Sequence, residues 1–175
     1  PPRTDVVVIS CEHGGNAVPT AYAEYFSDQR ALLDSHRGWD PGALPLARQM
    51  ARALSVPLHA CTTTRLLVDL NRSIGHRQLF SEVTRPLPPG RRRAVVEQHY
   101  RPHRNKVESA IAAHIANGRR VIHIASHSFT PELGGVVRQA DVAWLYDPRR
   151  AGECRLARAW MTAFAQHLPG LRLRR

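Results

Sequence analysis

Two stretches of the chain are continuously apolar and rich in β-branched side chains. They cover residues 5–10 and 121–125. Strands that are buried on both faces of a parallel sheet have this composition, so both stretches are predicted to be such strands. Each is followed at once by a polar loop, residues 11–16 in the first case and 126–131 in the second. Ligands of α/β proteins commonly bind at strand ends of this kind.

Helical spacing of apolar residues predicts three longer helices, over residues 41–54, 93–117 and 151–168. Asp40 is expected to be the N-cap of the first helix, ahead of Pro41 at its first position. Pro102 is expected to kink or split the second helix, which Gly118 should close.

Weaker patterns predict three further strands and one loop. Short strands are expected over residues 55–60, 65–70 and 141–146, and an irregular surface loop is expected over the Pro- and Gly-containing segment 77–92. Strands therefore alternate with helices along the chain. This order predicts the α/β class, a three-layer sandwich in which helices flank a mixed, mostly parallel central sheet.

The length of 175 residues suits a single catalytic domain over residues 1–175. No apolar run approaches the roughly 20 residues that cross a bilayer, so no membrane contact is expected. The start of the chain lacks the layout of a signal peptide, which makes the cytoplasm the expected location. Cys11, Cys61 and Cys154 are odd in number and far apart, so free thiols are expected rather than disulfides.

The formal net charge is +11, and Lys106 is the only lysine. Such a charge suits a protein that binds nucleic acid or an enzyme with an anionic substrate. The basic residues are mostly dispersed, and no aromatic residues alternate with them to stack on bases. Nucleic-acid binding is therefore the less favoured interpretation, and the oligomeric state is left open.

The side chains best suited to chemistry follow the ends of the two predicted buried strands. His13 follows the first buried strand and His127 follows the later one. Parallel strands that end at one edge of a sheet would bring these imidazoles together, and a catalytic zinc ion needs three protein ligands plus an open position. Glu12, Asp40 and His36 are the candidates for the third ligand. Taken alone, each histidine is more simply explained as a loop residue, and Asp40 as the N-cap of a helix.

A second group of polar residues frames segment 65–70. Arg65 is its first residue, and Asn71 and Arg72 follow it. Guanidinium groups bind carboxylates in a bidentate way, so these residues could hold an acidic substrate. The alternative is that both arginines simply pair with Asp69 and a neighbouring group.

Several of these segments together resemble the N-formylglutamate amidohydrolase family. The similar segments occur in one order along nearly the whole chain: residues 10–19, 39–40, 64–65, 69–72, 100–103, 126–131, 138–141 and 145–148. The resemblance implies a fold similar to the zinc exopeptidases and the aspartoacylase group. It also implies that His13 and His127 bind zinc, that Arg65 contacts the substrate carbonyl, and that Asn71 with Arg72 binds a carboxylate.

The chain departs from the exopeptidase pattern at two points. Asn16 stands where those enzymes have a glutamate ligand, so Asp40 is the preferred third ligand and Glu12 the second choice. The late glutamate that serves those enzymes as general base has no convincing counterpart, since Glu132 lies too close to His127 and Glu153 starts a helix. We therefore expect a C-terminal segment beyond residue 175 to be missing.

The predicted function is zinc-dependent hydrolysis of the amide or formyl bond of an N-acyl acidic amino acid such as N-formylglutamate. Zn²⁺ held by His13, Asp40 and His127 would activate water, with Arg65 and Glu12 as catalytic residues. The expected substrate contacts are Asn71, Arg72, Arg138, Asn16 and Ser128. The alternatives are a zinc deacylase for another N-acyl amino acid, a non-catalytic family member, and a nucleic-acid-binding protein.

Overall fold

The computed structural model describes residues 5–175. The first four residues, which belong to the segment without a signal-peptide layout, lie outside this range. The chain forms two compact units, Pro1–Phe129 and Thr130–Arg175. Each unit has strands of its own. That both units belong to one catalytic domain stays a prediction.

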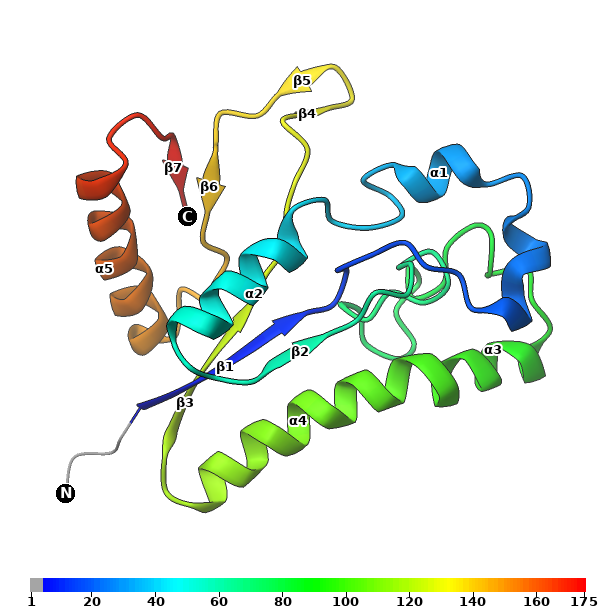
Figure 1. The fold of residues 1–175 in the computed structure, drawn as a ribbon, viewed down its shortest axis with the longest axis horizontal. Coiled ribbons are helices and arrows are strands. Elements are labelled where there is room, and N and C mark those ends of the chain that lie inside the picture. Colours follow the sequence, from blue (N-terminus) through cyan, green and yellow to red (C-terminus); the bar gives the residue numbers. More distant parts are fainter. Residues whose placement is uncertain (1–4) are drawn as a thin grey trace. The chain divides into compact units, whose positions relative to one another are not determined.

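The first unit is built on a three-stranded parallel sheet in the order β2-β1-β3 (Figure 1). Its strands are β1 (Asp5–Cys11), β2 (Leu58–Ala60) and β3 (Arg120–Ala125). The two apolar stretches are thus confirmed as parallel strands, and β2 confirms the C-terminal half of the strand expected over residues 55–60. β1 is central and becomes fully buried along its second half, whereas β3 is an edge strand with several exposed residues. The prediction that residues 121–125 are buried on both faces is wrong, since none of them is fully buried and His123 and Ala125 are exposed.

Helices cover both faces of this sheet. Helix α2 (Ala43–Ala53) packs on the face that carries Ile9 and Cys11, and helix α4 (Arg101–Ala116) contacts β1 and β3 on the other side (Figure 1). Side chains alternate between faces along a strand, so Ser10 and Glu12 point toward α4. The unit is therefore α/β, with a parallel sheet between helices. All three cysteines are free thiols, as predicted.

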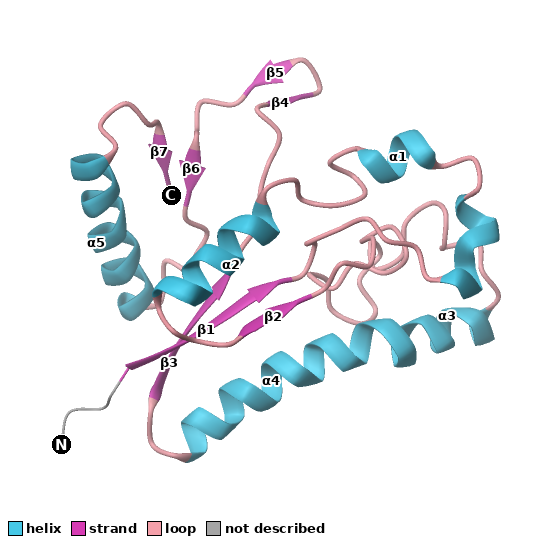
Figure 2. Ribbon diagram, in the orientation of Figure 1, coloured by secondary structure: helices cyan, strands magenta, loops and turns pink. Residues whose placement is uncertain are grey.

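The strand expected over residues 65–70 is wrong. Figure 2 draws the stretch of chain that follows β2 as loop. Residues 65–70 form turns there, although Leu66, Leu67, Val68 and Leu70 are buried in an apolar cluster. Side-chain hydroxyls replace the missing strand partner: Ser81 donates to the Leu66 carbonyl, and Thr84 donates to the carbonyls of Leu66 and Leu67. The backbone groups of a buried segment need partners, and hydroxyls of a neighbouring loop can supply them.

The long helix predicted over residues 93–117 is present, and its hydrogen-bond pattern changes just before Pro102, where a kink or split was expected. Helix α3 (Pro89–Val95) continues through a π-helical turn (Val96–Tyr100) into α4, and Pro102 lies in the first turn of α4. Helix α3 begins at Pro89, so the irregular loop is four residues shorter than predicted. Gly118 has a φ of 70° and follows the end of α4, which confirms its closing role.

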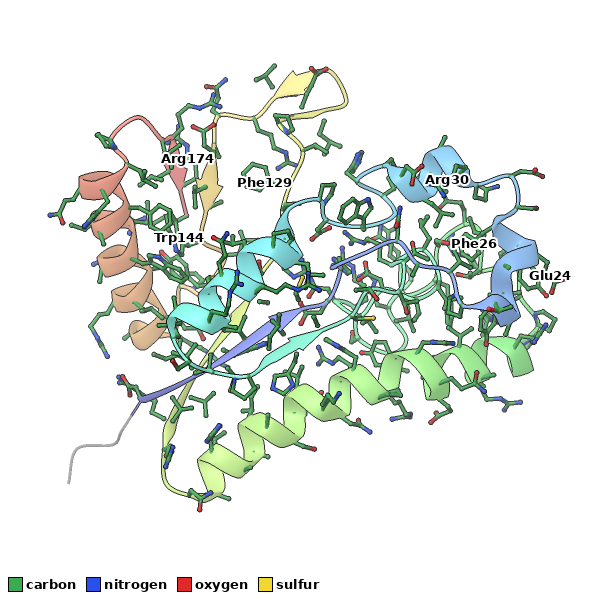
Figure 3. The ribbon with its side chains drawn as sticks, viewed as in Figure 1. Glu24, Phe26, Arg30, Phe129, Trp144 and Arg174 are labelled. Atoms are coloured by element: carbon green, nitrogen blue, oxygen red, sulfur yellow. The ribbon has the colours of Figure 1, made fainter. Side chains whose placement is uncertain are left out.

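Two short helical segments were not predicted. They are a 3₁₀ helix (Thr20–Phe26) and helix α1 (Arg30–Asp34), where Figure 3 labels Phe26 and Arg30. Tyr22 and Phe26 enter the same apolar cluster as the buried turns of residues 66–70. Segments of five to seven residues show too little periodicity to be recognised.

The second unit contains two small sheets and one long helix. Its elements are β4 (Glu132–Leu133) antiparallel to β5 (Val136–Val137), β6 (Val142–Ala143) parallel to β7 (Leu173–Arg174), and α5 (Ala151–His167). The strand expected over residues 141–146 is reduced to two residues, and the helix expected over 151–168 is confirmed. Trp144, labelled in Figure 3, packs edge-on against Trp160 and Phe164 of α5. Across residues 5–175, no helix combines the length and apolar character needed to cross a bilayer.

Candidate metal site

The loop after β1 lies tightly against the chain that follows β2. The Gly14 amide donates to the Cys61 carbonyl at 2.9 Å, and a Cβ atom at Gly14 would approach that oxygen to 2.9 Å. A β-carbon at Gly15 would approach the Thr62 carbonyl equally closely, at 2.8 Å. Only glycine allows this approach, which holds His13 at the sheet edge with 1% of its surface exposed.

Asp40 is placed by backbone contacts rather than by a capping role. Its amide donates to the His13 carbonyl at 3.0 Å. The N-cap of α2 is Gly42, at a φ of 83°, and no side chain caps the helix, so the N-cap prediction for Asp40 is wrong. Because Gly42 turns the chain into the helix, the buried Asp40 carboxylate is left to contact the two imidazoles.

The structure brings His13, Asp40 and His127 together. Asp40 Oδ2 lies 3.4 Å from His13 Nδ1 and 2.8 Å from His127 Nδ1. The imidazole centroids are 5.0 Å apart, and one ligand atom from each of the three residues lies within 4.8 Å of the others. β1 and β3 are adjacent and parallel, so the loops that follow them meet at one edge of the sheet.

The outer nitrogen of each imidazole also faces a carboxylate. His13 Nε2 lies 2.8 Å from Asp69 Oδ1, and His127 Nε2 lies 3.4 Å from Glu12 Oε2. Histidines that bind metals usually have such a carboxylate on the second nitrogen, because it fixes the tautomer and the orientation of the ring. Burial alone would lower the pKa of His13, but Asp40 and Asp69 together raise it above its ordinary value.

Arg65 links the two aspartates. Its Nη1 lies 3.3 Å from Asp40 Oδ1 and its Nη2 lies 2.7 Å from Asp69 Oδ2. Burial opposes ionisation of both carboxyl groups, yet hydrogen bonds from the imidazoles and the charges around them hold both pKa values well below 3.8. Both groups are therefore anionic at neutral pH and available to a cation.

The donor set fits a zinc ion. Zinc ions in proteins bind imidazole nitrogen and carboxylate oxygen at metal–ligand distances of about 2.0–2.2 Å. A set of two nitrogens and one oxygen leaves the fourth coordination position open. Glu12 lies on the Nε2 edge of His127, opposite the edge that faces Asp40, and exposed His36 is not part of the group. Among residues 5–175, the group of three that could hold a metal is therefore His13, Asp40 and His127.

Arg72 and Asn71 lie beside this group. Arg72 Nε is 3.9 Å from Asp69 Oδ2 and is buried without a hydrogen-bond partner, while its carbonyl accepts a bond from the Tyr100 hydroxyl at 2.7 Å. The Asn71 side chain is exposed, and the backbone N–H of Asn71 donates to Asp69 Oδ1 at 2.9 Å. Asp69 thus contacts both arginines, which was the simpler explanation from sequence.

The other expected substrate contacts are spread out. The Asn16 amide donates to the Leu33 carbonyl and to Asp34 Oδ1, so it is already engaged by the chain. Ser128 is partly buried immediately after His127. Arg138 is exposed in the second unit. Substrate binding by all three stays a prediction.

Two neighbours of the site, Asp69 and His103, were given no role at the metal site from sequence: Asp69 was considered only as a partner of the arginines, and His103 only as part of a segment similar to the family. His103 Nε2 lies 3.7 Å from Glu12 Oε1. Burial would raise the pKa of Glu12, but the nearby side chains of His103, Ser10 and His127 lower it to about 2. Tyr100, His103 and Val107 are all buried at helical spacing, and this pattern could have indicated that His103 faces inward.

Comparisons with known proteins agree with this architecture. The crystal structure of gene product Atu2144 from Agrobacterium tumefaciens is similar, with a TM-score of 0.83 and 30% sequence identity over 97% of this chain and 68% of that chain. Comparison with curated proteins found none that matches. The family model described as FGase, N-formylglutamate amidohydrolase, matches residues 6–175. The match spans nearly all of the described residues, and the chain therefore belongs to the N-formylglutamate amidohydrolase family.

Proposed function

We propose that this protein is a zinc-dependent amidohydrolase that cleaves the formyl or acyl amide bond of an N-acyl acidic amino acid such as N-formylglutamate. The family is one of amidohydrolases acting on a small molecule, and this supports the reaction class. The observation that carries the zinc requirement is the meeting of two imidazoles and one carboxylate, with a further carboxylate on the outer nitrogen of each ring. A scaffold like that of the zinc exopeptidases is part of the same proposal.

His13, Asp40 and His127 would hold the ion, and Asp69 would orient His13. When bound, zinc supplies Lewis acidity that activates water and polarises a carbonyl group. Arg65 is charged, only partly exposed and in contact with both aspartates. It would offset their charge and donate to the negative charge that develops on the carbonyl oxygen, an interaction that typically contributes about 10²–10³ in rate.

Arg72 and Asn71 would bind the carboxylate of the amino-acid half. Arg72 supports this role because its Nε is buried and lacks a hydrogen-bond partner. Correct placement of the carboxylate positions the amide bond, which lowers the entropic part of the barrier. Arg138, Asn16 and Ser128 are proposed as further contacts, and the net charge of +11 would favour the encounter with an anionic substrate.

Metal analysis of the purified protein, combined with hydrolysis of N-formylglutamate and of a panel of other N-acyl amino acids, tests the proposal. The wild type is expected to hold about one zinc ion per chain, as a three-ligand catalytic site does. His127→Ala should lose the ion and the activity, whereas His114→Ala, on partly exposed helix α4, should keep both. Arg72→Ala should keep the ion and raise KM.

Three results would contradict the proposal. They are a metal-free wild type that hydrolyses its substrate, a His127→Ala variant that is fully metallated and active, and a wild type that binds zinc but cleaves no member of the panel. Loss of zinc from Arg72→Ala would instead assign that residue a structural role.

A further inference from the structure

Glu12 lies between two imidazoles that come from different elements. Its Oε2 is 3.4 Å from His127 Nε2, and its Oε1 is 3.7 Å from His103 Nε2 on α4. The side chains of Glu12 and His103 are each 7% exposed. The pair is therefore a buried ionisable cluster on the α4 side of the sheet, next to the metal site.

The hydrogen-bonding capacity of these groups determines which of their atoms must carry a proton. An ionised carboxylate only accepts hydrogen bonds, so both Nε2 atoms facing it have to be N–H donors. Glu12 Oε2, His103 Nε2 and His127 Nε2 are buried atoms without a hydrogen-bond partner. All three belong to this one cluster, and both separations exceed a normal hydrogen bond by only a few tenths of an ångström. A small inward movement of Glu12 and His103 would satisfy all three.

The consequence for His127 is specific. In the metal-free protein Nδ1 is an N–H donor to the Asp40 carboxylate, whose Oδ2 lies 2.8 Å away. An ion would replace that proton, and a proton held on Nε2 then leaves the Nδ1 lone pair free to bind the ion. Glu12 lies on the opposite edge of the same ring and so cannot share an ion with Nδ1. His103 is not a member of the group of three that could hold a metal, and it faces Glu12, which in turn faces His127.

Resting on the proposed function, we propose that Glu12 and His103 are positioning residues for metal binding. Glu12 keeps the His127 proton on Nε2 and the Nδ1 lone pair directed at the ion, and His103 holds Glu12 in place. Glu12 then acts through His127 rather than on the substrate.

Zinc affinity, measured by competition with a chromophoric chelator, tests this role with four variants. Glu12→Gln accepts from one imidazole and must donate to the other, and His103→Leu removes the donor while keeping the volume. Both are expected to weaken zinc binding by about 10–100-fold, the usual effect of losing such a partner. His103→Gln restores an N–H near the Nε2 position and should bind zinc within about threefold of the wild type. His114→Gln, on the same helix, is the matched control and should be unchanged.

Two spectroscopic measurements separate positioning from a loss of folding. The visible absorption of bound Co²⁺ should change in Glu12→Gln and His103→Leu, since it reports ligand geometry, while far-ultraviolet circular dichroism stays that of the wild type. Nitrogen-15 NMR of the metal-free wild type should show a proton on His127 Nε2. That measurement needs neither a variant nor a metal, so an Nε2 without a proton overturns the inference even if variants fail to fold.

The results also separate this inference from the proposed function. A wild type that binds zinc while Glu12→Gln and His103→Leu bind it equally tightly overturns the positioning role and leaves the proposed function standing. A wild type that binds no zinc overturns the proposed function, and the Nε2 proton then still decides whether Glu12 orients His127.

Discussion

At the C-terminal end of strand β1, the two faces are equally buried but chemically opposite. Ile9 and Cys11 point toward α2, where they meet Ala43, Leu44, Ala47 and Ala51 in a wholly apolar cluster. Ser10 and Glu12 point toward α4, where Ser10 bonds the His123 ring of β3 at 2.8 Å and Glu12 faces His103. Ile9 and Ser10 are neighbours in sequence, and neither has any exposed surface.

The contrast shows how one strand serves both stability and chemistry. Burying apolar area stabilises the fold without fixing any polar atom in place. Burying polar groups contributes little net stability, but each group then needs a partner in a defined direction. The α2 face therefore supports the strand, while the α4 face and the loop beyond it hold imidazoles and carboxylates in fixed orientations.

The largest effect is expected from breaking the apolar face. Ile9→Ala should lower the free energy of unfolding by about 2–5 kcal/mol, because it removes buried methyl groups and leaves a cavity against α2. Urea denaturation measures this loss, and Leu46→Ala on the exposed side of α2 should cost less than about 0.5 kcal/mol. Zinc affinity of the folded Ile9→Ala protein should stay within about threefold of the wild type. A large drop in that affinity would show that the two faces are not independent.

Breaking the polar region at Asp69 is expected to have a smaller and different effect. Asp69→Asn keeps the volume but replaces the anionic acceptor on His13 Nε2, so zinc affinity should fall by about 10–100-fold, or about 1.4–2.7 kcal/mol. Chelator competition measures the change, and Asp28→Asn, at an exposed position away from the site, is the matched control. An unchanged zinc affinity would mean that His13 does not need Asp69 for its orientation.

The pH dependence sharpens the comparison further. In the metal-free protein, His13 has a raised pKa, so its contribution to stability is complete below its ordinary value of 6.5 and is lost as pH rises through the folded-state pKa. Asp40 and Asp69 have lowered pKa values, so their contributions are present above 3.8 and are lost as pH falls through their folded-state values. This polar cluster should therefore stabilise the metal-free fold most between pH 3.8 and pH 6.5.

Zinc affinity should show the opposite trend. Binding needs neutral imidazoles, so affinity should increase by up to about tenfold per pH unit while His13 is still protonated. The α2 face adds nothing over this range, since burial and the nearby carboxylates raise the pKa of Cys11 to about 11. Urea denaturation without zinc and zinc titration, each at about pH 5 and about pH 8, measure the two trends. Parallel trends would contradict the assignment of His13 as a ligand.

The sequence by itself determined the strands at residues 5–10 and 121–125, the histidine that follows each, and the three longer helices. These features depend on local composition and periodicity, which do not require knowledge of distant contacts. The change in the helix just before Pro102 and its end at Gly118 were predictable for the same reason, since both follow from the backbone geometry of one residue type.

Only the tertiary structure decided the rest. Residues 65–70 have the composition of a strand, but hydroxyls of Ser81 and Thr84 take the place of a strand partner. Asp40 precedes a helix as an N-cap would, yet Gly42 makes the turn and frees the carboxylate. Asp69 and His103 reach the site from separate segments. Helical spacing can indicate that His103 faces inward, but no local pattern shows which distant residue a buried side chain will contact.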